Sequence, residues 1–198
     1  AGKSTTLEVL TGGDGSRIGH GVPDFTRTIE GVDWEGLRVV DTPGIEGFSS
    51  DTREQAKAFL ERADIVGFVI SDDHIEQALL RNILAILTRR KPLLILLNVK
   101  GQPERLLRRP GSVFRDKEIT GHIRRIRRFL RDALEKSEIS IDPSAVPVIP
   151  YCAEAANVAR NTDYLDDEQR DALFTVSRFG TVVETLLELV RSRGVVIR

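Results

Sequence analysis

Hydrophobic and polar positions along this chain follow two kinds of spacing. Uninterrupted apolar runs at 65–70 and 93–99 are typical of parallel strands buried on both faces. Between and after them, apolar residues recur every three or four positions, the spacing of helices that bury one side. This spacing predicts helices at 4–10, 51–63, 75–90, 118–136 and 180–193, and further strands are predicted at 28–34, 37–40 and 146–149.

Strands and helices therefore alternate from end to end. This order predicts an α/β fold in three layers, α/β/α, with helices on both faces of a mostly parallel central sheet. Ligands of such sheets bind at the carboxyl ends of the strands. We expect one domain over residues 1–198, containing an irregular insertion at 102–117 and a basic amphipathic helix that ends at 136. The acidic segment 163–171 is predicted to be a helical connector.

Composition narrows the class of protein. Of the 198 residues, 40% are hydrophobic and 30% are charged, which is ordinary for a soluble globular protein. The net charge of −1 argues neither for nucleic acid nor for an acidic membrane surface as the partner of the whole chain. The single cysteine excludes an internal disulfide, and we expect a cytoplasmic protein, with membrane association only through regions outside this sequence.

The first five residues, Ala1-Gly2-Lys3-Ser4-Thr5, read as the end of the phosphate-binding motif G-x-x-x-x-G-K-[ST]. A loop that enters a helix N-terminus points backbone N–H groups at phosphate oxygens. Gly2 would allow close approach, the Lys3 ammonium would reach the phosphates, and the Ser4 hydroxyl would bind Mg²⁺. A chance Gly-Lys-Ser at a helix cap is the alternative. Under the first interpretation, the opening glycine and the first strand of the sheet precede Ala1, so the domain is truncated at its N-terminus.

A second motif follows an apolar strand at 39–40. Its sequence is Asp41-Thr42-Pro43-Gly44, and a segment with five glycines separates it from the first motif. A carboxylate at a strand end can hold Mg²⁺, and the Gly44 N–H can meet a γ-phosphate with no side chain in the way. Alone, this sequence would be an ordinary turn. Its position after Gly-Lys-Ser-Thr favours the nucleotide interpretation.

In this order the motifs resemble those of the translation-factor-like P-loop GTPases. The likeness is greatest to the Era/TrmE/EngA-like branch, the 50S ribosome-binding GTPase group, with some likeness to dynamin-related and AIG1-type GTPases. The resemblance implies GTP/GDP and Mg²⁺ as ligands, and Ser4, Thr26 and Asp41 as metal ligands. Thr26 lies in Phe25-Thr26-Arg27, which is similar to the switch I element of the family and matches it better than Thr28 does. Lys3, Thr26 and Gly44 are then the expected catalytic residues.

The base-reading motifs depart from the family. Asn98-Val99-Lys100-Gly101 stands where the family usually has N-K-x-D. Asn98 fits, Lys100 lies one position late for the lysine along the base, and Gly101 takes the position of the carboxylate that selects guanine. Because that acceptor is missing, guanine specificity follows from the resemblance rather than from these residues.

A fifth motif, Cys152-Ala153-Glu154, resembles the family's S-A-x loop. The resemblance implies that these three residues contact the nucleotide and that the Ala153 N–H meets guanine O6. For Cys152 we favour a small buried residue beneath the loop over a reactive thiol.

The function implied by the resemblance is a regulatory GTPase that hydrolyses GTP to GDP and phosphate. Ile45 follows Gly44 where Ras-like proteins place a water-orienting glutamine, so slow intrinsic turnover is expected. One alternative is a nucleotide-dependent assembly or membrane-associated module, similar to dynamin, with little hydrolysis. Another is a P-loop protein that uses ATP, because of Gly101.

Arginines are concentrated in one part of the chain. We interpret them as the solvated face of the amphipathic helix, with a surface for RNA, the ribosome or an anionic membrane as the alternative. A protein partner or self-association is expected for a switch. These arginines are residues 105, 108, 109, 115, 124, 125, 127, 128 and 131.

Overall fold

The computed structural model describes residues 2–13, 31–40, 58, 60–71, 83, 85–110, 112–135 and 141–192. More than half of each of the helices expected at 51–63 and 75–90 lies outside the described residues, and so do residues 28–30 of the first expected strand.

Three parallel strands form the central sheet. They are β3 (Val66–Ser71), β4 (Leu93–Asn98) and β5 (Val148–Tyr151), in the order β3-β4-β5. All six residues of β4 are buried, as the apolar run predicted. The register sets Ser71 opposite Asn98 and Asn98 opposite Tyr151, so polar residues meet at the carboxyl edge of the sheet.

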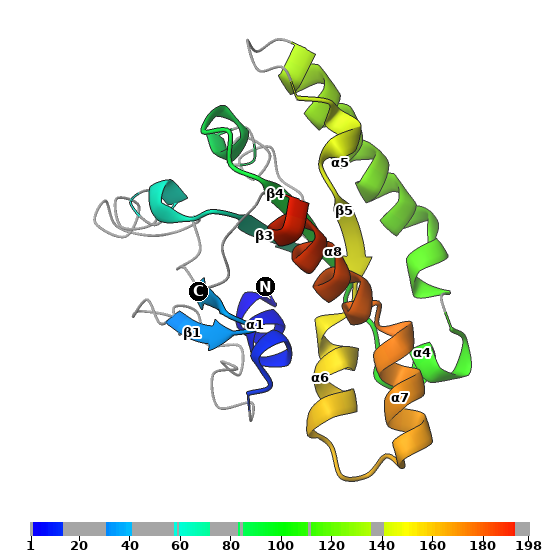
Figure 1. Ribbon diagram of the computed structural model, residues 1–198. Coiled ribbons are helices and arrows are strands. Elements are labelled where there is room, and N and C mark those ends of the chain that lie inside the picture. The colour runs from blue at the N-terminus through cyan, green and yellow to red at the C-terminus, as the bar shows by residue number, and fades with distance from the viewer. Residues whose placement is uncertain are drawn as a thin grey trace, which may run out of the picture.

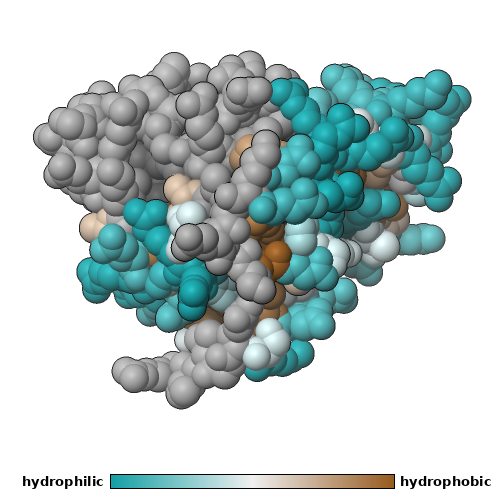
Figure 2. All heavy atoms as spheres, turned by 90° about the horizontal axis from the view of Figure 1, so that it is seen from above, coloured by the Kyte–Doolittle hydropathy of each residue, from teal (hydrophilic) through white to brown (hydrophobic). Residues whose placement is uncertain are grey.

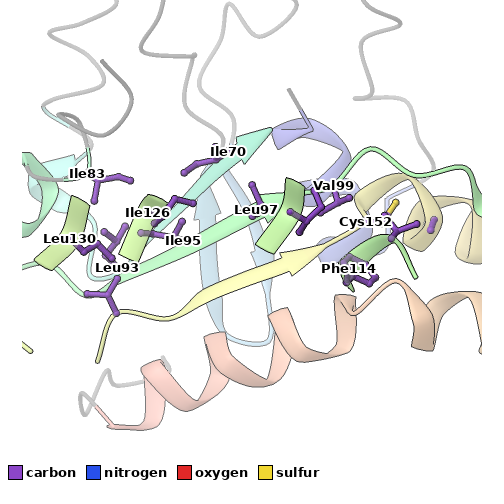
Figure 3. Close-up of a cluster of buried hydrophobic side chains, with 14 of the residues drawn as sticks. Ile70, Ile83, Leu93, Ile95, Leu97, Val99, Phe114, Ile126, Leu130 and Cys152 are labelled. Atoms are coloured by element: carbon purple, nitrogen blue, oxygen red, sulfur yellow. The ribbon is translucent and has the colours of Figure 1, made fainter. Parts of the chain in front are cut away.

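Alternate residues of β4 belong to two different hydrophobic clusters. Leu93, Ile95 and Leu97 pack with α5 (Lys117–Glu135), and Figure 3 shows this first cluster. Leu94 and Leu96 pack instead with α1 (Lys3–Thr11) and α8 (Phe179–Ser192) in the second cluster. Figure 1 shows α5 and α8 on opposite sides of the strands. The predicted three-layer α/β/α fold is therefore confirmed.

A two-stranded antiparallel sheet lies beside α1 (Figure 1). It consists of β1 (Gly31–Trp34) and β2 (Leu37–Val40), joined by Glu35 and Gly36 at φ 50° and 75°. Two successive positive φ angles suit the right-handed twist of a tight hairpin. Trp34 and Val39 pack against the second cluster, so the hairpin is attached to the face of the sheet that carries α1.

The segment after β4 differs from the prediction. We expected an irregular insertion at 102–117, but it contains α4 (Pro103–Arg108) and a 3-10 turn, η1 (Val113–Arg115). Leu106, Val113 and Phe114 are buried in the first cluster. The Pro and Gly residues that suggested irregularity lie around these short elements: Pro103 is the first residue of α4, where its missing N–H costs nothing.

The C-terminal third holds a helix that was not predicted, α6 (Ala153–Asn161). It buries only alanines, which carry a weak periodic signal. The acidic connector is helical, as predicted, but α7 (Asp167–Val176) begins only after Asp166, whose carboxylate and Gln169 form a capping box. A 3-10 turn, η2 (Pro143–Ala145), precedes β5, and β5 begins two residues later than predicted.

Hydrophilic residues cover most of the described surface in the view of Figure 2. In the described parts of the chain, Tyr164 is the exposed large hydrophobic residue. None of their helices combines the length and the apolar character needed to cross a lipid bilayer.

Candidate functional site

The start of α1 forms a left-handed turn at the sheet's carboxyl edge. Gly2 precedes the helix at φ 90° and ψ 2°, and its carbonyl accepts the Thr6 N–H at 2.9 Å. An L side chain rarely adopts this φ, so the glycine is required by the backbone itself. Lys3, Ser4 and Thr5 follow as half-buried residues of the first helical turn.

Gly2 packs directly against Asn98, the last residue of β4. A Cβ atom at position 2 would lie 2.2 Å from Asn98 Nδ2. We expected a glycine at position 2 because it lets a phosphate approach closely. The structure gives a second reason for a glycine here, because the Asn98 amide occupies the space that a Cβ atom would need. Residues 96 positions apart in sequence are thereby brought together, as the combined motifs predicted.

The same amide holds the fifth motif. Asn98 Oδ1 accepts the Ala153 N–H at 3.0 Å, and both residues are buried. Asn98 therefore joins the phosphate loop to the first turn of α6. The guanine O6 contact expected for the Ala153 N–H competes with Asn98 for the same proton.

Cys152 lies beneath the base-side loops. Its side chain is fully buried, its N–H donates to Ser177 O at 2.9 Å, and Sγ lies 3.7 Å from Gly101 O. Burial raises the pKa of the Cys152 thiol, so it stays protonated at neutral pH. The interpretation of Cys152 as a small buried residue is confirmed, and Figure 3 shows it at the end of the first cluster beyond Val99.

Gly101 faces the protein interior. A Cβ atom built there would lie 3.5 Å from Leu106 and 3.7 Å from both Val113 and Cys152 Sγ. A carboxylate at this position would be directed among apolar groups rather than toward a base. Gly101 was expected to take the position of the family's acidic residue, and the structure shows that α4 and η1 close over that side of the loop.

The neighbouring base-side residues take different environments. Val99, in the position of the family's lysine, is buried, and its N–H donates to Tyr151 O at 2.7 Å. Lys100 and Glu154 are exposed. Only these two of the predicted base-side residues present charged side chains at the surface.

Sequence reasoning missed one pair in the site. The hydroxyl of Tyr151, at the end of β5, lies 2.5 Å from Thr6 Oγ1 on α1. A tyrosine directly before the fifth motif was the available signal, but nothing in the sequence indicated a partner 145 positions away.

Four predicted site residues lie outside the described parts of the chain: Ala1, Thr26, Asp41 and Gly44. Of the proposed Mg²⁺ ligands, only Ser4 lies among the described residues. Within the described residues, no group of three His, Cys, Asp or Glu side chains could hold a metal ion.

The described residues fit the phosphates of a nucleotide. A left-handed glycine leads into the N-terminus of a helix, which carries partial positive charge, and a lysine stands at the first helical position. These groups lie at the carboxyl edge of a parallel sheet, where ligands of doubly wound folds bind.

Comparison with protein families gives a match to half of the chain. The model described as 50S ribosome-binding GTPase matches residues 1–99, half of the chain. The match includes both phosphate motifs and Asn98, and it ends before Lys100, Gly101 and the fifth motif. No curated protein and no solved structure matches the chain.

Proposed function

Because this chain belongs to the 50S ribosome-binding GTPase family and is a GTP-binding protein, we propose that it is a Mg²⁺-dependent hydrolase and regulatory switch. The proposed reaction converts GTP to GDP and phosphate. Within the family we place the chain with the Era/TrmE/EngA-like branch and expect it to act in the cytoplasm.

One observation carries this proposal. The left-handed Gly2 turn meets the Asn98 side chain, which in turn holds the Ala153 N–H. Three segments far apart in the sequence, each assigned to a nucleotide motif, thus converge at one edge of the sheet. A chance Gly-Lys-Ser sequence at a helix cap would have no reason to contact the other two.

The described residues support specific roles in phosphate binding. The Lys3 ammonium and the backbone N–H groups at the start of α1 would neutralise phosphate charge as the γ-phosphoryl group leaves. Ser4, Thr26 and Asp41 would hold Mg²⁺, which adds positive charge at the phosphates when bound. The Gly44 N–H would contact the γ-phosphate and lose that contact after hydrolysis, which releases the segment and switches the protein.

Slow intrinsic turnover is part of the proposal. Ile45 cannot orient a water molecule, so Arg27, a monovalent cation or an arginine from a partner would have to assist the attack. We therefore expect hydrolysis to be measurable in single-turnover experiments and faster with the partner present.

The exposed arginines are the proposed partner surface. The segment 101–135 carries nine Arg and one Lys against two Asp and three Glu, a net charge of +5, although the whole chain carries −1. Arg124, Arg128 and Arg131 share one exposed side of α5. This charge segregation favours an anionic partner such as ribosomal RNA, with an anionic membrane as the alternative.

A second candidate function is ATP use, and the inward direction of Gly101 favours it. With no carboxylate aimed at the base from this position, discrimination between guanine and adenine depends on other groups. A dynamin-like assembly module is a further alternative, and it predicts nucleotide-dependent self-association with little hydrolysis.

Competition with a fluorescent GDP analogue tests these proposals. GTP and GDP should displace the analogue in the presence of Mg²⁺, whereas ATP should not. Equal displacement by ATP would contradict guanine specificity, and absence of binding by any nucleotide would contradict the proposed function. Light scattering with GTP would detect the assembly expected of a dynamin-like module.

A further inference from the structure

Tyr151 carries a buried hydroxyl group at the candidate site. The residue is 0% exposed, ends β5, and packs its ring against Phe179, with the ring centroids 6.0 Å apart. Burial is the main cause that raises the pKa of Tyr151, so its hydroxyl remains a hydrogen-bond donor at neutral pH. A buried phenol O–H requires an acceptor, and the only atom paired with it among the described hydrogen bonds is Thr6 Oγ1, 2.5 Å away.

The direction of this hydrogen bond follows from the second bond that Thr6 makes. The Thr6 hydroxyl donates to Gly2 O at 2.6 Å. Because a hydroxyl has a single proton, Thr6 Oγ1 can only accept from Tyr151. The result is a directed chain in which the Tyr151 O–H donates to Thr6, and the Thr6 O–H donates to Gly2.

This chain ends on a peptide group that faces the phosphate position. The Gly2 carbonyl also accepts the Thr6 N–H, so two donors from Thr6 hold it along the axis of α1. The Gly2 C=O and the Lys3 N–H belong to one planar trans peptide and point in opposite directions. Holding the carbonyl toward Thr6 therefore directs the Lys3 N–H outward from the N-terminus of α1, toward an approaching anion.

We propose that Tyr151 is a positioning residue for phosphate binding, acting through the Thr6 hydroxyl and the Gly2–Lys3 peptide group. The inference rests on the proposed function, since it assigns a role within the same nucleotide site. The backbone carbonyl of Tyr151 also accepts the Val99 N–H at 2.7 Å, and Tyr151 directly precedes Cys152 and Ala153. The residue therefore couples the base-side loops to the phosphate loop by a route separate from Asn98.

Isosteric substitutions separate this role from simple packing. Tyr151→Phe keeps the ring against Phe179 and removes only the hydroxyl, and Thr6→Val keeps the shape of the side chain and removes both hydrogen bonds. Thr6→Ser retains the hydroxyl. Tyr164→Phe is the matched control, because Tyr164 is 69% exposed and lies on the connection between α6 and α7.

The experiment measures GDP dissociation constants and nucleotide-free thermal unfolding for these variants of the full chain. We expect Tyr151→Phe and Thr6→Val each to weaken GDP binding by about 5- to 10-fold. The double variant should bind no more weakly than Thr6→Val alone, since the two hydrogen bonds act in series. Thr6→Ser and Tyr164→Phe should bind GDP within about twofold of the wild type.

Three outcomes would overturn the inference, and they are distinguishable from one another. If the wild type binds GDP and Tyr151→Phe binds equally well, with only a lower unfolding temperature, Tyr151 has a structural role alone and the proposed function stands. If the wild type binds no guanine nucleotide, the proposed function fails together with the inference. Additive losses in the double variant would also contradict a serial chain.

Discussion

The proposed phosphate end of the site, Gly2–Thr5, and its proposed base end, at 98–101 and 152–154, contain different kinds of groups. At the phosphate end every described residue matches the expected motif, and the backbone turn is held by hydrogen bonds from Thr6. At the base end the charged positions of the family are occupied by a buried valine and an inward-facing glycine. At this end, the Asn98 side chain accepts the Ala153 N–H, and the Cys152 side chain is fully buried beneath the loops.

Under the proposed function, this difference predicts where binding energy and specificity arise. Charge and directed N–H groups are concentrated at the phosphates, so affinity should depend mainly on that end. The base end contributes shape and backbone contacts, which discriminate between bases less strongly than a charged hydrogen bond does. Four substitutions test this contrast, in order of decreasing expected effect.

Lys3→Ala should have the largest effect. Removing the ammonium group eliminates a charge-assisted contact to the phosphates, and we expect GTP affinity to fall about 100-fold. Lys100→Ala at the exposed base end is the control and should weaken binding by no more than about threefold. Isothermal titration with GTP measures both. Equal losses would contradict the contrast between the two ends.

Gly2→Ala should weaken nucleotide binding about tenfold. The new Cβ would displace the Asn98 side chain, because the two would lie 2.2 Å apart, and the left-handed backbone would be strained. Gly12→Ala is a matched control, since Gly12 has φ 69° but nothing within 4 Å of its Cβ position. It should lower stability by about 1 kcal/mol and leave GDP affinity unchanged. A similar affinity loss in both variants would show that strain, rather than contact with Asn98, is responsible.

Gly101→Asp should fail to improve guanine selectivity. The carboxylate would meet the apolar groups of Leu106, Val113 and Cys152, so we expect a loss of roughly 1–3 kcal/mol in unfolding free energy. Gly101→Ala makes ordinary contacts and should be nearly neutral. The ratio of GTP to ATP affinity should stay the same in both variants. A marked rise of that ratio in Gly101→Asp would show that the side chain reaches the base.

Cys152→Ser should have the smallest effect on nucleotide binding, and the pH dependence that it removes from stability is confined to alkaline pH. The folded-state pKa of the thiol is raised above its ordinary value of 9.0, so the unfolded chain loses this proton first as the pH rises. The stability of the wild type should therefore fall above pH 9.0, by at most about 1.4 kcal/mol per pH unit from this group. Urea unfolding between about pH 8 and about pH 10 should show a shallower decline for Cys152→Ser. Parallel curves would contradict a buried, protonated thiol.

The parts of the fold that follow from local patterns could be predicted from the sequence. The apolar run of β4 and the two strands on either side of Glu35 and Gly36 are examples, because strand burial and hairpin geometry depend on neighbouring residues. Asn98 and Cys152 could also be assigned, since each lies at a recognisable strand end. Helix α6 was missed because its buried face consists of alanines.

The parts that depend on tertiary packing could not be predicted. The direction of Gly101 is set by α4 and η1, whose own positions depend on the first cluster. The Tyr151–Thr6 hydrogen bond joins segments whose proximity exists only in the folded sheet. The roles of Ala1, Thr26, Asp41 and Gly44 stay predictions, because they lie outside the described residues.

The position of Trp34 has a practical consequence. It is the only tryptophan of the chain, and it packs from the β1–β2 hairpin onto the cluster that supports α1. Emission from this single indole can be assigned without labelling to one place in the molecule. Its wavelength and quenching would thus give a native optical readout of the hairpin's environment as nucleotide is added.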